Sequence, residues 1–493
     1  MTDEPNDFRP EARVPRGFAD KRAPTLRAER EIVEAVSAVY EQWGFEPLDT
    51  GAFEYADALG KFLPDADRPN AGVFALQDDP DSEGKNGQWM ALRYVLTAPL
   101  ARFAAQSWET LPKPFRRYAV GTVWRNEKPG PGRFREFIQC DADTVGSARP
   151  EADAEIVAMA SAGLESAGLP PGTAVLKINN RKLLNGLLTA AGVTTDGQKL
   201  GVLRAVDKLD RLGIEGVRLL LGEGRLDESG AFTKGAGLNA KAADAVLAFV
   251  EAKGDGRAAT LAKLADVIGG SEEGDAGLEE LARIDAALNG LGVTGDKATF
   301  DPSVVRGLEY YTGPVYEAEL LIETGGERFG SVGGGGRYDD LVARFTGQQV
   351  PATGFSFGVS RLAAALKAAG RDLGAESRGP VVVIAFDEAR MADYFAVAAE
   401  LRGAGIPAEV YLGSSGMKAQ MKYADRRLSP AAVIIGEDEI AAGTVTVKDL
   451  DLGRELARGV TDNTEWREQR PGQQTIPRGE LIAVVRKIVE GGQ

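Results

Sequence analysis

The sequence predicts an α+β fold in several domains: an antiparallel sheet with flanking helices, a helical insertion, and a small α/β domain near the C-terminus. A chain of 493 residues is too long for one hydrophobic core, so roughly two to four domains are expected. Strand-like segments flank a turn-forming stretch at 127–133, which predicts an antiparallel hairpin. The composition shifts to Ala, Leu, Gly and charged residues over 181–296, and strand and helix patterns alternate after residue 380.

The first element expected is a helix. Apolar residues at helical spacing predict that it opens near Thr25, its N-cap, and stops at Gly44. Residues 64–88 are rich in Pro, Asp, Gly and Asn, so a loop or irregular hairpin is expected there. A second helix is expected over 91–107.

The remaining elements follow from the same patterns. They are strands at 116–126, 134–145 and 174–179, a helix from Arg181, a glycine-rich β region at 303–345, a helix over 356–369 and a linker at 370–379. The predicted segments are therefore 1–180, 181–296, 297–372 and 378–493.

Composition removes several classes of chemistry. The chain contains no histidine, so a Ser-His-Asp triad, a histidine zinc site and a histidine general base are excluded. Its one cysteine, Cys140, allows no intrachain disulfide and fits a reducing compartment. No apolar run is long enough to span a bilayer. The first seven residues have neither a basic patch nor an apolar core, so no secretory signal is expected.

Charge is distributed unevenly. The net charge is −15, which argues against non-specific coating of nucleic acid. Residues 113–135 nevertheless contain seven basic residues and one acid, Glu127. This segment is either a local patch for an anionic ligand or a surface loop balanced by acids elsewhere.

The hairpin carries residues suited to a nucleotide. Arg125 and Glu127 belong to Trp124-Arg125-Asn126-Glu127, and the second strand has Arg133-x3-Phe137-x3-Asp141. An arginine fork can bridge a phosphate and a carboxylate, a carboxylate can accept from an exocyclic amine, and a phenylalanine can stack on a purine. The spacing resembles motif 2 of class II aminoacyl-tRNA synthetases.

Four further segments resemble the same class or one of its families. Gly354-Phe355-Ser356-Phe357-Gly358-Val359-Ser360-Arg361 is similar to its motif 3. Val305 to Gly313, which contains Arg306-Gly307-Leu308-Glu309-Tyr310-Tyr311, and Gly333 to Asp339 resemble the two signatures of the histidyl-tRNA synthetase family, with Glu309 where the family usually has Asp. Gly413 to Asp425 is similar to that family's anticodon-binding domain.

The resemblance implies a fold and a set of roles. The fold is that of a class II synthetase-like catalytic domain with a helical insertion and a C-terminal α/β anticodon-binding domain. The implied catalytic residues are Arg125 and Arg306, the ATP-binding residues are Glu127, Arg133, Phe137 and Arg361, and the histidine-binding residues are Thr97, Gln139, Asp143, Tyr310 and Tyr311. ATP with Mg²⁺, L-histidine and tRNA(His) are the implied ligands of a cytoplasmic homodimer with no membrane partner.

Two positions depart from the family pattern. Leu92-Arg93-Tyr94-Val95-Leu96-Thr97 has Val95 where the family has a carboxylate that anchors the α-ammonium group, and Gln139 or Asp141 is a possible substitute. Gly51 stands where motif 1 carries a proline at the dimer interface.

Two alternative functions stay open at this stage. One is a synthetase-like regulatory subunit of ATP phosphoribosyltransferase, although such proteins lack the terminal domain and lose catalytic arginines. The other is a plain nucleic-acid-binding module, which would not need an ATP-directed pair such as Phe137 and Arg361.

Overall fold

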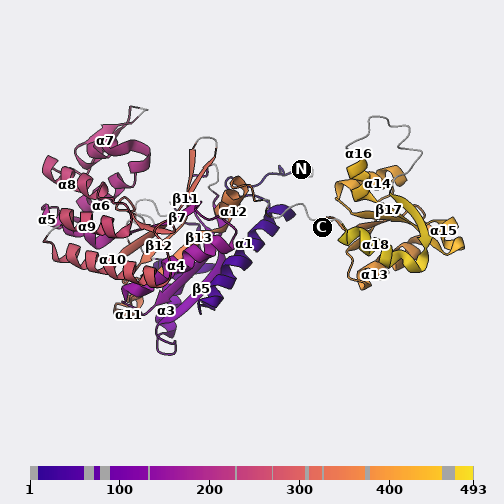
Figure 1. The fold of residues 1–493 in the computed structure, drawn as a ribbon, viewed down its shortest axis with the longest axis horizontal. Helices are drawn as coiled ribbons and strands as arrows, with labels where there is room; N and C mark the ends of the chain where they lie inside the picture. The colour runs from indigo at the N-terminus through magenta and orange to yellow at the C-terminus, as the bar shows by residue number, and fades with distance from the viewer. Residues whose placement is uncertain are drawn as a thin grey trace, which may run out of the picture. The chain divides into compact units, whose positions relative to one another are not determined.

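The computed structural model divides into two compact units, Met1–Gly374 and Ala375–Gln493 (Figure 1). The residues that it describes are 9–59, 72–77, 89–130, 134–227, 230–268, 270–305, 310–324, 327–371, 373, 378–457 and 472–491. The first unit contains an α+β domain built on a large, mostly antiparallel sheet, and the second is an α/β domain, so the predicted fold class is confirmed.

Eight strands form the large sheet, in the order β1-β5-β6-β13-β12-β11-β7-β10. Their bounds are β1 Glu46–Pro47, β5 Phe115–Trp124, β6 Glu136–Val145, β7 Ala174–Asn180, β10 Ala298–Phe300, β11 Pro314–Thr324, β12 Glu327–Arg337 and β13 Ala352–Gly358. All pairs are antiparallel except β1 with β5 and β10 with β7. The predicted hairpin is therefore present as β5 and β6, paired directly from Phe115 and Val145 to Trp124 and Glu136.

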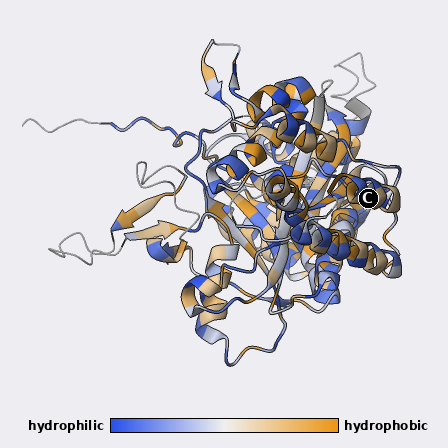
Figure 2. Cartoon of the chain, turned by 90° about the vertical axis from the view of Figure 1, so that its left-hand side faces the viewer, coloured by the Kyte–Doolittle hydropathy of each residue, from blue (hydrophilic) through white to orange (hydrophobic). Residues whose placement is uncertain are grey.

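One face of this sheet is covered by helices (Figure 1). They are α1 Ala23–Gln42, α4 Pro150–Ser166 and α12 Val359–Ala368, whose apolar residues form one core with the sheet. Figure 2 shows helices that carry both hydrophobic and hydrophilic residues, as helices that pack one side on a core do. The helix expected over 356–369 begins only at Val359, because Phe355 and Phe357 are buried in β13 between β12 and β6.

The first helix differs from its prediction at one end. Gly44 has a positive φ of 79° and follows the helix, as predicted for a C-terminal stop. The N-cap is Arg22 rather than Thr25, and a proline occupies the first turn of α1. Pro24 suits that position because its missing N–H would be unpaired there in any case.

A three-stranded sheet, in the order β2-β4-β3, precedes the hairpin. Its strands are β2 Phe53–Tyr55, β3 Ala75–Gln77 and β4 Trp89–Leu92. The helix predicted over 91–107 is shorter, α3 Thr97–Ser107. Pro99 explains the difference, because proline is tolerated only in the first turn of a helix.

The region 181–296 is mainly helical, as the composition predicts. Its elements are α5 Arg181–Ala190, α6 Asp196–Val206, α7 Leu209–Leu221, β8 Gly224–Leu226, β9 Phe232–Lys234, α8 Ala240–Val250, α9 Arg257–Ile268 and α10 Glu272–Gly290. The strands β8 and β9 form a small hairpin that was not predicted.

The second unit has a mixed five-stranded sheet in the order β15-β14-β16-β17-β18. Its elements are β14 Val381–Ile384, α13 Met391–Gly403, β15 Ala408–Val410, α14 Met417–Arg426, β16 Ala431–Ile434, α15 Glu437–Ala442, β17 Thr444–Asp449, α16 Leu450–Ala457, β18 Gln473–Pro477 and α18 Leu481–Glu490. Strands β14, β15 and β16 are parallel, which the alternation of strand and helix patterns predicts.

Candidate functional site

A cavity of about 290 Å³ lies in the first unit, lined from the large sheet and the start of α3. The sequence-predicted residues that line it are Thr97, Arg125, Phe137, Gln139, Asp143, Tyr310, Tyr311 and Arg361. They come from segments up to 264 positions apart in the chain, from Thr97 to Arg361. The fold therefore brings the nucleotide-directed and the amino-acid-directed candidates to one place.

Three predicted residues are not among those lining the cavity. Arg133 and Arg306 lie outside the described residues. Glu127 accepts a hydrogen bond of 2.8 Å from the hydroxyl of Tyr94, whose ring contacts the cavity residue Arg125. Burial, opposed by the charge of Arg125 and reinforced by Glu127, raises the pKa of Tyr94 to about 12, so this hydroxyl keeps its proton at neutral pH.

Arg125 is held by two aromatic rings. Its guanidinium carbon lies 4.6 Å from the ring centroid of Tyr94 and 5.0 Å from that of Phe137. Its Nε also donates to the carbonyl oxygen of Tyr94 at 3.4 Å. Cation–π contact on two sides limits the rotation of a long side chain, so the guanidinium is positioned before any anion arrives.

Strand β6 supplies the polar floor of the cavity. Side chains two positions apart in a strand point to the same face, and Gln139, Asp141 and Asp143 all line the cavity. The residues between them, Cys140 and Ala142, are fully buried in the core with the helices. All three polar side chains are at most 7% exposed, so their hydrogen bonds and charges act in a poorly solvated environment.

Asp143 has two strong partners. Its Oδ2 lies 2.9 Å from Nη2 of Arg117, which is 1% exposed, and its Oδ1 accepts from the hydroxyl of Tyr338. Arg117 also donates to the carbonyl of Leu96 at 3.2 Å. Burial raises the pKa of Asp143, while Arg117 and Tyr338 act in the opposite direction. A buried carboxylate between a guanidinium and a phenol is fixed in position.

Glycines make room for these side chains. A Cβ at Gly354 would collide with the carboxylate of Asp143, and a Cβ at Gly336 would lie 2.9 Å from the ring of Tyr311. The glycine run of β12 therefore allows the sheet to accommodate the two tyrosines, whose ring centroids are 4.2 Å apart. Burial raises the pKa of Tyr310, so it too stays protonated.

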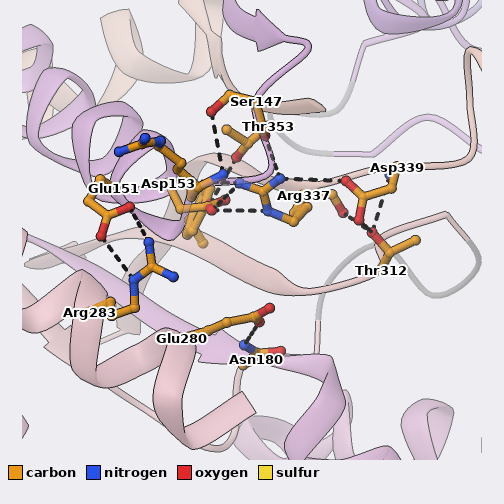
Figure 3. Close-up of polar contacts among 12 residues, drawn as sticks. Ser147, Glu151, Asp153, Asn180, Glu280, Arg283, Thr312, Arg337, Asp339 and Thr353 are labelled. Carbon is orange, nitrogen blue, oxygen red and sulfur yellow. Dashed lines mark hydrogen bonds and ion pairs between the residues drawn. The ribbon is translucent and has the colours of Figure 1, made fainter. Parts of the chain in front are cut away.

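A buried polar network holds the second signature segment to α4 (Figure 3). Arg337 Nε donates to Oδ2 of Asp153 at 3.0 Å, and Nη1 donates to the carbonyl of Ser147 at 2.8 Å. Asp153 also accepts from the hydroxyl of Tyr316. Because Tyr338 follows Arg337 directly, this network also sets the position of the phenol that contacts Asp143.

Several site residues were missed by the sequence prediction. Arg117 and Tyr338 belong to the site because both contact Asp143. No local pattern in the sequence indicates these contacts, which join residues of β5 and β6 with the residue that follows β12. Asp141 was not missed, because the sequence offered it as a possible substitute for the carboxylate that is absent at position 95. The basic segment 113–135 is not one anion patch, since Arg116 pairs with Glu155 and Arg117 with Asp143.

Comparison with known proteins finds relatives along nearly the whole chain. The family model described as histidyl-tRNA synthetase matches residues 17–362, and a model described as anticodon binding domain matches residues 380–488. A histidine–tRNA ligase of Caulobacter vibrioides is 74% identical over 497 residues, with 99% of each chain covered. One of Paracoccus denitrificans is 54% identical, also with 99% of each chain covered.

Solved structures share the fold. The histidyl-tRNA synthetase of Nostoc sp. PCC 7120 matches with a TM-score of 0.69 at 28% identity, covering 97% of this chain and 100% of that one. A Bacillus halodurans protein described as ATP phosphoribosyltransferase regulatory subunit/histidyl-tRNA synthetase matches with a TM-score of 0.64 over 84% of this chain and 97% of that one; at 22% identity this shows the fold alone. On the matched residues and the full-length identity, the chain belongs to the histidyl-tRNA synthetase family.

Proposed function

We propose that this chain is a histidine–tRNA ligase, which activates L-histidine with ATP and transfers it to the 3′ end of tRNA(His). The observation that carries the proposal is the single cavity shared by Arg125, Arg361, Asp143 and the tyrosine pair. The guanidinium groups of the cavity suit an anionic nucleotide. Its buried carboxylate and its phenol groups, which lie beside them, suit the imidazole of histidine. The full-length likeness to histidine–tRNA ligases supports the same activity.

In the proposed first step, the histidine carboxylate attacks the α-phosphorus of ATP and pyrophosphate leaves. Arg125 bridges the substrate carboxylate and the α-phosphate, and Arg361 contacts the outer phosphates. We assign adenine to Phe137 and Glu127, a further phosphate contact to Arg133, and the charge that develops at the α-phosphate to Arg306. Such a reaction needs positioning and charge stabilisation more than proton transfer, so a chain without histidine can perform it.

The imidazole is assigned to Asp143, Tyr310 and Tyr311, with Thr97 and Gln139 near the amino group. In the second step the terminal ribose hydroxyl of the tRNA attacks the carbonyl of the adenylate, the bond from that carbonyl to the phosphate oxygen breaks, and AMP leaves. With no histidine in the chain, a phosphate oxygen of the adenylate is the proposed acceptor of that proton.

Magnesium is proposed to enter with the nucleotide. Among the described residues, no group of three or more acidic or cysteine side chains is arranged to hold a metal ion. Mg²⁺ commonly binds substrate phosphates and several waters with one or two carboxylates, so a prebuilt protein cage is not required. The ion would neutralise phosphate charge, while Arg125 and Arg361 orient the triphosphate.

We assign residues 1–180 and 297–372 to the catalytic domain, 181–296 to the insertion and 378–493 to anticodon binding. A second cavity, of about 570 Å³, lies in the last of these segments, where Gly413 to Gly416 adjoin Phe386 and Tyr411. Aromatic side chains at such a surface can stack on unpaired bases. We propose the cytoplasm as the location of the enzyme, because its substrates ATP and tRNA are found there. Among the described residues, no helix is long and apolar enough to cross a bilayer.

A homodimer is proposed from one exposed surface. Phe53 and Tyr55 of β2 and Leu76 of β3 lie on the same face of the three-stranded sheet and are 44%, 45% and 42% exposed. Glu54 and Ala91, on the opposite face, are buried. A contiguous exposed apolar face of this kind marks a protein interface. Gly51, which replaces the family's proline, lies just before β2.

The test is ATP–pyrophosphate exchange, followed by charging of tRNA(His). Exchange should depend on L-histidine and should not occur with phenylalanine or glutamine, because the buried polar groups of the pocket would be left without partners. A regulatory subunit of ATP phosphoribosyltransferase, or a plain nucleic-acid-binding module, would show no exchange.

A further inference from the structure

We infer that Asp141 binds the α-ammonium group of the amino-acid substrate, a contact that Val95 cannot make. The inference rests on the proposed function and adds a specificity-determining residue to it. Val95 and Asp141 line the same cavity, and Val95 is an apolar residue that is 9% exposed. The cavity wall therefore carries no charge at position 95, while its floor carries one at position 141.

Asp141 lines the cavity although it is only 2% exposed, and the residues that pair with it in register are small. It pairs in register with Ala119 on β5 and with Ser356 on β13, and Ser356 pairs in turn with Gly334 on β12. None of these neighbours has a side chain long enough to cross the carboxylate and close the cavity over it. A ligand that enters from the cavity therefore meets Asp141 directly.

Two acceptor atoms on this floor have neither a hydrogen-bond donor nor an ion-pair partner among the residues that the structure describes. They are Oδ1 of Asp141 and Oε1 of Gln139, and both are buried. The Gln139 amide instead donates to the Ser356 hydroxyl, which hydrogen-bonds to Asp141. A buried acceptor without a donor is unfavourable, and an ammonium group carries three donors and no acceptor. The floor is therefore complementary to an ammonium group.

The charges around Asp141 also favour a cationic ligand. Asp143 is already paired with Arg117 and hydrogen-bonded to Tyr338, whereas the hydrogen-bond partner of Asp141 is the neutral Ser356. The other charged groups that act on Asp141 are Asp143, Arg117 and Arg125. Of these, Arg125 is stacked between two rings, so it is not folded over Asp141. A buried carboxylate without its own cation calls for a cationic ligand.

The ionisation of Asp141 is consistent with this role. Burial, and next the charge of Asp143, raise the pKa of Asp141 to about 7. A bound ammonium group would favour the ionised carboxylate and bring that pKa down again. Substrate binding and deprotonation of Asp141 are therefore coupled.

The experiment compares two ligands on one variant. Affinities for L-histidine and for 3-(imidazol-4-yl)propionate, which lacks the α-amino group, are measured by calorimetry on the wild-type chain and on Asp141→Asn. The variant should bind L-histidine about 10- to 100-fold more weakly, the range for a buried charge-assisted hydrogen bond. Its affinity for the propionate should stay within about threefold of the wild-type value.

Two further variants keep the result interpretable. Asp301→Asn removes another buried carboxylate, which pairs with Lys177 and Lys253 outside the cavity, and should leave both affinities unchanged. Val95→Glu added to Asp141→Asn should restore at least part of the preference for L-histidine, because it returns a carboxylate to the same cavity.

The inference is overturned if Asp141→Asn weakens the binding of both ligands equally or of neither. It is also overturned if adding Val95→Glu does not restore any of the preference for L-histidine. The proposed function fails by a different result, namely a wild-type chain that does not exchange pyrophosphate in the presence of L-histidine.

Discussion

The buried pair of Arg337 and Asp153 gives the sharpest prediction on stability (Figure 3). Arg337 is 4% exposed and Asp153 0%, and the arginine also donates to the carbonyl oxygens of Ser147 and Arg149 at 2.8 and 3.1 Å. Asp153→Asn removes the negative charge and keeps the shape. The guanidinium then stays buried with two carbonyl partners and loses its close ion pair, and the counter-charge that remains is the carboxylate of Asp339, 3.6 Å from Nη1. Tyr316 faces a weaker acceptor.

The expected loss follows from that geometry. Removing one partner of a buried ion pair costs about 3–5 kcal/mol, because the other charge is left uncompensated. The entropy of unfolding is about 2.1 cal/mol/K per residue, which for the 374-residue unit Met1–Gly374 gives about 0.8 kcal/mol/K. The melting temperature of that unit should therefore fall by about 4–6 °C. Since Tyr338 adjoins Arg337, the KM for L-histidine should rise as well.

Calorimetry and a histidine titration check this prediction together. Glu151→Gln is the matched control: it lies on the same helix, and its pair with Arg283 is 44% exposed on both sides, so its loss should cost less than about 1 kcal/mol. The double variant Asp153→Leu/Arg337→Met should recover much of the loss, because neither charge remains. The reasoning fails if Asp153→Asn melts within a degree of the wild type, or if the double variant is no more stable than the single one.

Three further predictions concern the cavity. Gly354→Ala would drive a methyl group against the Asp143 carboxylate, so histidine binding should fall by at least tenfold in a calorimetric titration; unchanged affinity would show that the strand can shift. Arg361→Ala should slow ATP–pyrophosphate exchange by on the order of 10²–10³ with little change in histidine affinity, and an undiminished rate would remove Arg361 from the ATP site. The third concerns pH. The pKa of Asp141 is about 7 in the folded chain and about 3.9 in the unfolded chain. The folded chain therefore binds the extra proton, and this contribution to the free energy of unfolding is complete below about pH 4 and is lost as the pH rises to about 7, at on the order of 1 kcal/mol per pH unit. Asp141→Asn should lack that slope in denaturant titrations, and equal slopes in both chains would contradict the assignment.

The local signals in the sequence were sufficient for the elements that depend on near neighbours. The hairpin of β5 and β6 follows from two strand-forming runs around a Pro-Gly stretch, and Gly44 marks the end of α1 because it adopts a positive φ. The helix pattern placed the start of α3 too early in the chain. Pro99 indicates the correct start, because proline is tolerated only in the first turn of a helix. Short strands such as β1 were missed, since their pairing partners lie far away in the chain.

The sequence indicated which residues belong to the candidate site better than it indicated which of them pair with one another. Motif spacing grouped Arg125, Phe137 and Arg361 as candidates, and all three line one cavity in the structure. The partnership of Arg117 with Asp143 depends on the register of β5 against β6, which no single segment encodes. In the same way, the need for glycine at position 354 becomes visible only when Asp143 is seen beside it.

The alternation along β6 links binding to accessibility. Cys140 faces the helices, with its carbonyl accepting from the Tyr40 hydroxyl at 3.2 Å, while the residues on either side of it face the cavity. The thiol is the chain's only one, and it becomes reachable only when this strand leaves the sheet. When β6 has left the sheet, its carboxylates are no longer in register for the substrate. The substrate therefore binds the conformation in which β6 is paired, and an alkylating reagent reacts with the one in which it is not. The rate at which the thiol is modified would then report, without any added label, how often β6 separates from the sheet.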